Sequence, residues 1–324
     1  MLTADRPRLR LGHFPTRLTR WSDLGAHLGI DLWVKHEFEA DAFGSGNKVR
    51  KMEFLLAHVL DHGYTGMVLD GTTQSNCAMS AALYGPHNGL SLHLILYGAT
   101  TRVGNYVDVL RSGAQITQLP AWSPRNIADA QKRIFDRAGA EGQALYSVPT
   151  GATNTITVFA SIALAEEIAQ QEDEQGARFD FIVYPTGTGG TQAGLEIGRL
   201  VLGRNWSLVG VAVANDSEFF HRVTRELVKS PAVSQLIITN NIEQLNPWTH
   251  TDAQGPGYGV PLPDTFSEIR RLRFEFGLIL DSVYTYKAYI GLRQLINDRV
   301  IPAGASVVFI HTGGVNERFI HPVP

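Results

Sequence analysis

The sequence is poor in cysteine: Cys77 is the only one among 324 residues. A lone cysteine excludes an internal disulfide, and it excludes the groups of thiolates that hold structural zinc or iron–sulfur clusters. A reducing, intracellular setting fits this composition. The 11 histidines show no metal-ligand spacing and no HExxH segment occurs, so we expect no metal site.

Strong net charge and long apolar runs are also missing. The formal net charge of -3 gives no field that would attract nucleic acid or an anionic membrane. No apolar run is long enough to span a bilayer, and the first stretch, "MLTADRPRLRLGHFPTRL", has no apolar core of signal-peptide length. We therefore expect a soluble, cytoplasmic protein that binds neither nucleic acid nor membrane.

Short apolar runs alternate with helical patterns along most of the chain. Continuous Val/Ile/Leu runs between helices predict parallel sheets covered on both faces, and their number before and after residue 160 suggests two sheets with a cleft between them. The fold class predicted is therefore α/β with two lobes. A helix over 75–85, closed by Gly85, follows the first of these runs. The strands are predicted at 65–71, 92–98, 114–120, 144–149, 179–184, 207–216 and 305–314.

Lys48 occupies an unusual place in the stretch "GSGNKVRK". Apolar residues at helical spacing predict a helix that begins near Lys48, with Asn47 as the N-cap and Gly63 at its end. The positive end of the helix dipole disfavours an ammonium there. Lys48 therefore either points into water or works as a neutral amine.

The segment "YPTGTGGTQAG" joins an apolar strand to a helix. Backbone N–H groups freed by glycine at a helix start form an anion site, most often for phosphate, although a tight turn without a ligand is the alternative. Gln192 stands where a dinucleotide fingerprint needs its third glycine, which disfavours a nicotinamide-dependent oxidoreductase. No Walker-type lysine follows, and no GxSxG elbow occurs in the chain.

Three further stretches carry polar groups at strand ends or in loops. In "GTTQSN", Gln74, Ser75 and Asn76 could bind a carboxylate, or Ser75 could cap a helix. Tyr258 lies in a loop rich in proline and glycine, and Tyr284 lies at a predicted helix start; tyrosines in such places serve either packing or proton transfer. "HTGG" ends the last strand, where a structural histidine is the simpler interpretation.

The order of these motifs resembles that of the fold-type II pyridoxal-phosphate enzymes. Within that group the chain is similar to the D-cysteine desulfhydrase and 1-aminocyclopropane-1-carboxylate deaminase family. The resemblance covers nearly the whole chain and is most specific in "GNKVRKMEFLLA", "QSN", "GTGGTQAGL", "GYGVP" and "VYTYKA". It implies a small-molecule amino-acid substrate, a homodimer, a large cofactor-binding domain of residues 1–50 plus 162–324, and a small mobile domain of residues 51–161.

The resemblance also implies roles for individual residues. Lys48 would hold pyridoxal 5′-phosphate as a Schiff base and move the Cα proton. The substrate would be bound by Gln74, Ser75, Asn76 and Cys77, with Ser75, Tyr258 and Tyr284 also serving as catalytic groups on the reactive face. The cofactor would be bound by Lys48, Asn76, Thr188, Gly189, Gly190, Thr191 and Thr285.

Thr285 separates two reactions within the family. In the deaminases a glutamate that bonds the pyridine nitrogen follows the matching tyrosine, whereas threonine is neutral and fits β-elimination. The favoured function is therefore a lyase acting on D-cysteine or a related β-substituted amino acid. The alternatives are 1-aminocyclopropane-1-carboxylate deaminase, a specialised β-eliminating or β-replacing enzyme, and a non-catalytic pyridoxal-phosphate binder. Departures from the family pattern at Cys77, Met79, Ser282 and Tyr286 leave the substrate open.

Overall fold

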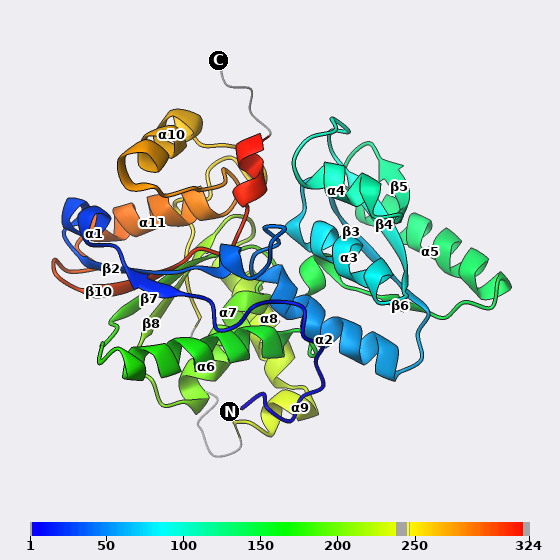
Figure 1. The fold of residues 1–324 in the computed structure, drawn as a ribbon, viewed down its shortest axis with the longest axis horizontal. Coiled ribbons are helices and arrows are strands. Elements are labelled where there is room, and N and C mark those ends of the chain that lie inside the picture. The colour runs from blue at the N-terminus through cyan, green and yellow to red at the C-terminus, as the bar shows by residue number, and fades with distance from the viewer. Residues whose placement is uncertain (1, 238–244, 246, 320–324) are drawn as a thin grey trace.

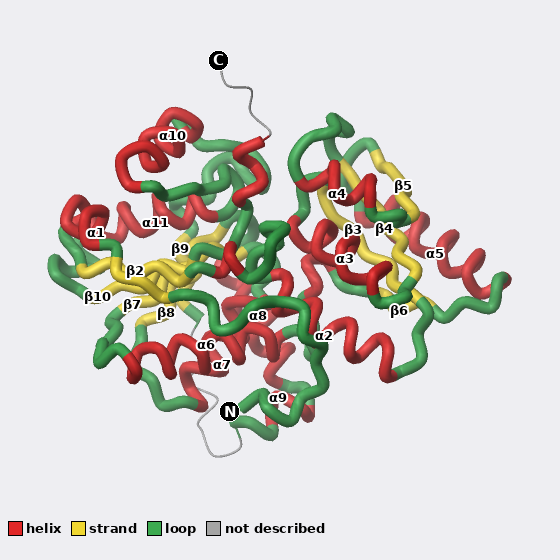
Figure 2. Tube along the Cα trace, viewed as in Figure 1, coloured by secondary structure: helices red, strands yellow, loops and turns green. Residues whose placement is uncertain are grey.

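The computed structural model describes residues 2–237, 245 and 247–319. In these ranges the strands form two separate sheets, one of six strands and one of four, with helices packed against them (Figure 1). Figure 2 shows the two sheets side by side, each between layers of helix. The prediction of an α/β protein with two mostly parallel sheets is confirmed.

The six-stranded sheet takes its strands from both ends of the chain, in the order β1-β2-β10-β7-β8-β9. β1 runs antiparallel to β2, and every other neighbouring pair is parallel. The strands are β1 (Leu18–Arg20), β2 (Asp31–Lys35), β7 (Phe181–Thr186), β8 (Ser207–Ala212), β9 (Trp248–His250) and β10 (Ser306–Ile310).

Both faces of this sheet are buried, which explains why its central strands are apolar throughout. In β10, Val307 and Phe309 enter a core shared with α1, α10 and α11, while Val308 and Ile310 enter a second core with α6 and α7. α8 and α9 pack beyond α7. These helices are α1 (Ser22–Leu28), α6 (Val158–Glu174), α7 (Gly190–Val201), α8 (Ser217–Val228), α9 (Pro231–Ser234), α10 (Thr265–Phe276) and α11 (Thr285–Asn297).

The four-stranded sheet is formed by the middle of the chain and is parallel throughout, in the order β5-β4-β3-β6. Met67 and Leu69 of β3 pack with α2, α3 and α4, while Val68 faces α5 on the other side. The elements are α2 (Lys48–Asp61), β3 (Gly66–Thr72), α3 (Asn76–His87), β4 (Ser91–Tyr97), α4 (Asn105–Arg111), β5 (Gln115–Leu119), α5 (Pro124–Ala140) and β6 (Leu145–Ser147).

Two helix ends differ in detail from the sequence prediction. α3 does not close at Gly85 but continues through Pro86 to His87. The left-handed residue that ends it is Gly89, with φ of +78°, and the N–H of Leu90 then bonds the Gly85 carbonyl at 3.1 Å. At the start of α2, Asn47 holds the predicted N-cap position but makes no capping bond; its side chain instead donates to the Thr191 hydroxyl at 3.4 Å and accepts from the Lys48 amine.

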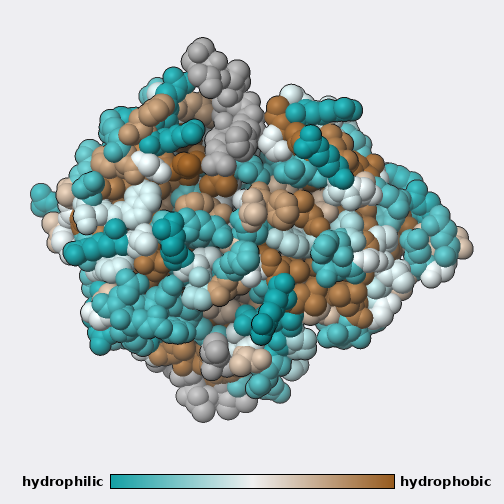
Figure 3. Space-filling model, in the orientation of Figure 1, coloured by the Kyte–Doolittle hydropathy of each residue, from teal (hydrophilic) through white to brown (hydrophobic). Residues whose placement is uncertain are grey.

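In the described ranges, no helix combines the length and apolarity needed to cross a membrane. Figure 3 shows hydrophilic and hydrophobic side chains interspersed over the face in view.

Candidate active site

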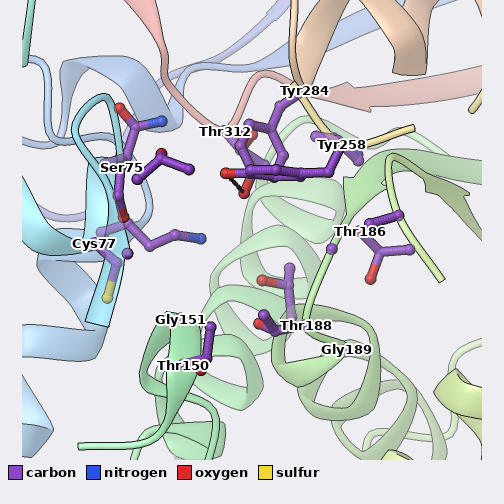
Figure 4. A pocket seen from close by; sticks show the side chains of 18 of the residues that line it. Ser75, Cys77, Thr150, Gly151, Thr186, Thr188, Gly189, Tyr258, Tyr284 and Thr312 are labelled. Atoms are coloured by element: carbon purple, nitrogen blue, oxygen red, sulfur yellow. Dashed lines mark hydrogen bonds between the residues drawn. The ribbon is translucent and has the colours of Figure 1, made fainter. Parts of the chain in front are cut away.

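Strands of both sheets end at one cavity of about 550 Å³. Such a volume is typical of small-molecule sites, and strand carboxyl ends are where α/β proteins bind ligands. The cavity has two walls, seen on opposite sides of Figure 4. The large-sheet wall comprises residues 185–189 and 191, Ala214, Asn215, Tyr258, Tyr284 and Thr312. The small-sheet wall comprises Asp70, Gly71, Thr72, Ser75, Asn76, Cys77, Tyr97, Trp122, Thr150 and Gly151.

Lys48 is the first residue of α2 and lines the cavity together with Asn47. Its amine donates to the Asn47 side-chain oxygen at 3.1 Å. Enclosure by protein lowers the pKa of Lys48, against a smaller opposing effect of Cys77. The structure therefore favours the neutral-amine interpretation, and a neutral lysine can act as a nucleophile and as a base.

The loop before Lys48 is fastened to the end of β10. Gly46 has φ of +63°, and a Cβ on it would lie 2.1 Å from the carbonyl oxygen of Thr312, so only glycine fits. The N–H of Asn47 donates to the same carbonyl at 2.9 Å. This contact places Lys48 beside the strand ends of the large sheet.

A buried ionic group fixes α2 from behind. Arg50 donates to both carboxylate oxygens of Glu37, at 2.6 and 2.8 Å, and to Glu167 of α6 at 2.8 Å. Arg50 and Glu37 are almost fully buried, and a bidentate pair between them restricts orientation strongly. The first turn of α2 is thereby held against the six-stranded sheet.

Lys51 was missed by the sequence interpretation. It lies one turn after Lys48 and is 2% exposed, and its amine donates to the carbonyls of Gly151 and Ala152 at 2.9 and 3.2 Å. Burial and the nearby charge of Lys48 lower the pKa of Lys51 to about 7. The signal was present in the i, i+3 spacing of the two lysines, which puts both on one helix face.

The glycine loop after β7 has the features of an anion cradle. Gly189 has φ of +82° and precedes α7, so the loop presents the helix N-terminus to the cavity. Of the four loop residues predicted to bind the cofactor, Thr188, Gly189 and Thr191 line the cavity and Gly190 does not. A Cβ on Gly190 would lie 2.8 Å from the Thr153 hydroxyl and 3.1 Å from the Lys51 amine, so this glycine makes room for both.

The loop between β3 and α3 divides into lining and non-lining residues. Ser75, Asn76 and Cys77 line the cavity, and Ser75 also caps α3 by accepting from the Ala78 N–H at 3.2 Å. Gln74 does not line it: its amide donates to the Val103 carbonyl at 3.0 Å, and its side-chain oxygen accepts the N–H of Asn105, the first residue of α4, at 3.1 Å. The structure therefore does not place Gln74 at the predicted substrate contact.

Tyr258 and Tyr284 meet in the large-sheet wall. Their hydroxyls lie 3.0 Å apart, as the dashed line in Figure 4 marks. Burial raises the pKa of both phenols, so each keeps its proton near neutral pH. Two protonated hydroxyls in contact can pass or share a proton at the edge of the cavity.

Thr285 is not brought into the cavity. It is fully buried, and its hydroxyl donates to the Asp281 carboxylate at 2.6 Å while accepting the Asp281 N–H at 2.8 Å. Thr285 therefore lies away from the predicted cofactor contact. The Asp281 carboxylate, which accepts the N–H groups of Val283, Tyr284 and Thr285, holds the start of α11. Thr312, from the "HTGG" segment, lines the cavity instead, and its place after the last strand was the available signal.

Of the four departures from the family pattern, Cys77 alone lines the cavity. Met79 and Tyr286 are buried in the two hydrophobic cores, and Ser282 bonds the Glu317 carboxylate. Burial raises the pKa of the Cys77 thiol, although Lys51 and Lys48 oppose that shift. Across the described ranges, His, Cys, Asp and Glu side chains form no group that could hold a metal ion.

Comparison with known proteins gives consistent results. A family model described as "Pyridoxal-phosphate dependent enzyme" matches residues 9–313. The chain is 30% identical to 1-aminocyclopropane-1-carboxylate deaminase of Ralstonia pickettii over 322 residues, covering 95% of this chain and 94% of that protein. It is 31% identical to D-cysteine desulfhydrase of Serratia proteamaculans over 332 residues, covering 98% and 97%. A solved structure of an ACC deaminase homologue superposes with a TM-score of 0.88 at 29% identity, covering 98% of this chain and 95% of that one.

Proposed function

The chain belongs to the pyridoxal-phosphate-dependent enzyme family, and from this we propose that it is a lyase that removes the Cα proton of a small amino acid and expels its β-substituent. One observation carries the proposal. Lys48, with a lowered pKa, lies in a single cavity together with an anion cradle and a pair of protonated tyrosines.

The cavity residues fit pyridoxal phosphate. The buried hydroxyl of Thr186 has no hydrogen-bond partner in the described part of the chain, although it lines the cavity beside the glycine loop. A Cβ on Gly151 would lie 2.7 Å from the Thr188 hydroxyl, so the space there depends on glycine. The glycine loop, Thr188 and Thr191 would hold the phosphate, Asn76 would bond the ring substituents, and Lys48 would hold the aldehyde carbon.

Bound pyridoxal phosphate supplies a ring that accepts the electron pair left at Cα. Lys48 takes the Cα proton at its amine, which its enclosure keeps available. Ser75 and Asn76, at the N-terminus of α3, orient the substrate carboxylate through that end of the helix. Tyr258 and Tyr284 supply a proton from their paired hydroxyls.

D-cysteine is the substrate we propose first, since one relative is named D-cysteine desulfhydrase. With one water, it would give pyruvate, hydrogen sulfide and ammonia. The second candidate is ring-opening deamination of 1-aminocyclopropane-1-carboxylate, favoured by another relative's name. The family resemblance gives the deaminases a glutamate at the position of Thr285, but Thr285 lies outside the cavity, so parallel assays of the two compounds decide between the reactions.

The first experiment is a visible absorption spectrum of the purified protein before and after adding D-cysteine, with pyruvate assayed in the same tube. We expect a cofactor band that shifts with substrate and pyruvate that accumulates. 1-Aminocyclopropane-1-carboxylate is assayed in parallel for a four-carbon oxo acid. A protein that stays colourless after incubation with pyridoxal phosphate would overturn the proposal.

We also propose that residues 1–50 plus 162–324 form the large domain and that residues 51–161 form a small mobile one. The two cavity walls support this division, because they come from different sheets.

The family resemblance supports a homodimer, and the single buried cysteine fits the reducing cytoplasm. Light scattering on a sizing column tests the dimer, which would have twice the mass of the chain.

A further inference from the structure

Asp70 is an acidic residue that the proposed reaction does not use. It lies near the end of β3, is 4% exposed and lines the cavity. One carboxylate oxygen accepts the hydroxyl of Thr150 at 2.9 Å. The other has no hydrogen-bond partner in the described ranges. A buried carboxylate supported by one neutral hydroxyl is unfavourable, so a ligand that supplied a charge-assisted donor would stabilise it.

Two aromatic side chains share this part of the small-sheet wall. Tyr97 ends β4, which pairs in parallel with β3 so that Tyr97 lies opposite Thr72, two residues after Asp70, and both Asp70 and Tyr97 line the cavity. Burial raises the pKa of Tyr97 to about 12, so its hydroxyl keeps its proton. Trp122 also lines the cavity although the residue is 61% exposed, which puts its indole at the mouth. Aromatic faces attract organic cations, and tryptophan does so most strongly.

The negative side chain in the cavity lining remains available to bind a substrate, whereas the positive one does not. Among the described lining residues, Asp70 is the only acid and Lys48 is the only lysine or arginine. Lys48 is already assigned to the cofactor and the Cα proton. An anionic side-chain group on the substrate would therefore find no positive partner, while a cationic group would find Asp70.

We propose that the substrate is an α-amino acid whose β-substituent carries a positive charge, and that Asp70 receives this charge with Tyr97 and Trp122 around it. This inference rests on the proposed lyase function, and it ranks a cationic β-substituent ahead of the neutral thiol of D-cysteine as the group that the cavity recognises. The simplest such compound is 2,3-diaminopropionate. The Cα proton goes to Lys48, the Cα–Cβ double bond forms as the Cβ–N bond breaks, and ammonia leaves. Water then hydrolyses the remaining enamine to pyruvate and a second ammonia.

The test compares β-substituents of different charge on the cofactor-loaded enzyme. Both enantiomers of 2,3-diaminopropionate, cysteine and cysteate supply a cationic, a neutral and an anionic group. Titration of the visible band gives a dissociation constant for each compound, and pyruvate gives kcat/KM. We expect the wild type to bind and turn over the cationic compound best. Asp70→Asn should weaken its binding by about 10- to 100-fold and change cysteine by less than about threefold.

Two variants serve as controls. Asp129→Asn removes an exposed carboxylate of α5 and should leave every value unchanged. Asp70→Glu keeps the negative charge and should keep the preference for the cationic compound. If Asp70→Asn does not fold, the comparison of Asp70→Glu with the wild type tests the inference. Equal weakening of all compounds in Asp70→Asn would mean a structural role and would overturn the inference.

The inference and the proposed function fail in different ways. If cysteine is bound and converted while 2,3-diaminopropionate is neither preferred nor sensitive to Asp70, the lyase stands and the cationic substrate falls. If the band shifts with 2,3-diaminopropionate in an Asp70-dependent way but no compound yields pyruvate, the recognition stands and the lyase function falls.

Discussion

The two walls of the cavity differ in how they are built and in how well the sequence revealed them. The large-sheet wall depends on backbone geometry: a glycine loop, a helix N-terminus and a loop fastened to a strand end. The small-sheet wall depends on single side chains such as Asp70, Cys77 and Trp122. Backbone sites suit a fixed group such as a phosphate, and side chains suit a variable one. The difference puts the proposed phosphate contacts in the large-sheet wall and most of the proposed substrate contacts in the small-sheet wall, with Asn76 of the small-sheet wall serving both.

The largest expected effect lies at Lys48, where the two walls meet. Lys48→Ala removes the amine that holds the cofactor and moves the proton, so kcat should fall at least about a thousandfold. The altered visible spectrum should accompany the loss. Lys132→Ala, on the exposed face of α5, is the control and should retain full activity. If Lys48→Ala kept more than a tenth of the wild-type activity, Lys48 would not be required for the reaction.

The large-sheet wall can be tested by filling the space that glycine leaves. Gly190→Ala puts a Cβ 2.8 Å from the Thr153 hydroxyl and 3.1 Å from the Lys51 amine, so both must shift. We expect cofactor affinity, measured by equilibrium dialysis, to fall about 10- to 100-fold. The reason is that the displaced Lys51 amine and Thr153 hydroxyl would lose charge-assisted hydrogen bonds.

Gly139→Ala is the matched control for that substitution. Gly139 also lies in a helix, but no atom lies within 4 Å of a Cβ placed there. This variant should keep cofactor affinity and gain about 0.5–1 kcal/mol of stability from helix propensity. Equal effects of the two substitutions on affinity would mean that the space beside Gly190 does not matter.

The pH dependence of stability tests Lys51, behind the glycine loop. Burial and Lys48 lower its pKa from 10.5 to about 7. Between those values the unfolded chain binds a proton that the folded, cofactor-free protein does not, so the contribution of Lys51 to stability rises with pH. Urea unfolding from pH 7 to 9 should therefore show a smaller rise in Lys51→Met than in wild type. Parallel pH profiles in the two proteins would contradict the lowered pKa.

The smallest expected effect is at Cys77, in the small-sheet wall. Cys77→Ala removes a 3% exposed thiol that lines the cavity without holding the cofactor. We expect KM for the substrate to change about two- to fivefold and kcat and cofactor affinity to stay near wild type, since one small contact is altered. A loss of cofactor in Cys77→Ala would contradict the proposal that this part of the small-sheet wall contacts the substrate and not the cofactor.

Sequence patterns predicted the fold well because apolar strand runs and glycine-rich strand ends are local signals. Lys48 and the glycine loop carry local signals of the same kind, whereas Tyr258 and Tyr284 were assigned roles by the family resemblance; the structure brings all of them to one cavity. Gln74 and Thr285 were predicted at the site, yet each satisfies its hydrogen bonds away from the cavity, at Val103 and Asp281. Which way a polar side chain points depends on partners that no local pattern reveals.

Asp70 and Tyr97 were missed for a related reason. Each stands within or at the end of an apolar strand run and gains its meaning only where parallel strands place their carboxyl ends together. Trp122 follows β5 in a loop with no motif, so tertiary packing alone brings it to the cavity mouth. Proximity between residues that are far apart in the sequence is therefore the part of the site that local patterns do not predict.

The strand order has one consequence for the history of such an enzyme. All four strands of the smaller sheet, and every residue of the wall at their ends, come from the continuous stretch between residues 66 and 151. The opposite wall is assembled from segments scattered over the rest of the chain. A single recombination event that exchanged this stretch would therefore deliver a complete new specificity surface to an inherited catalytic apparatus.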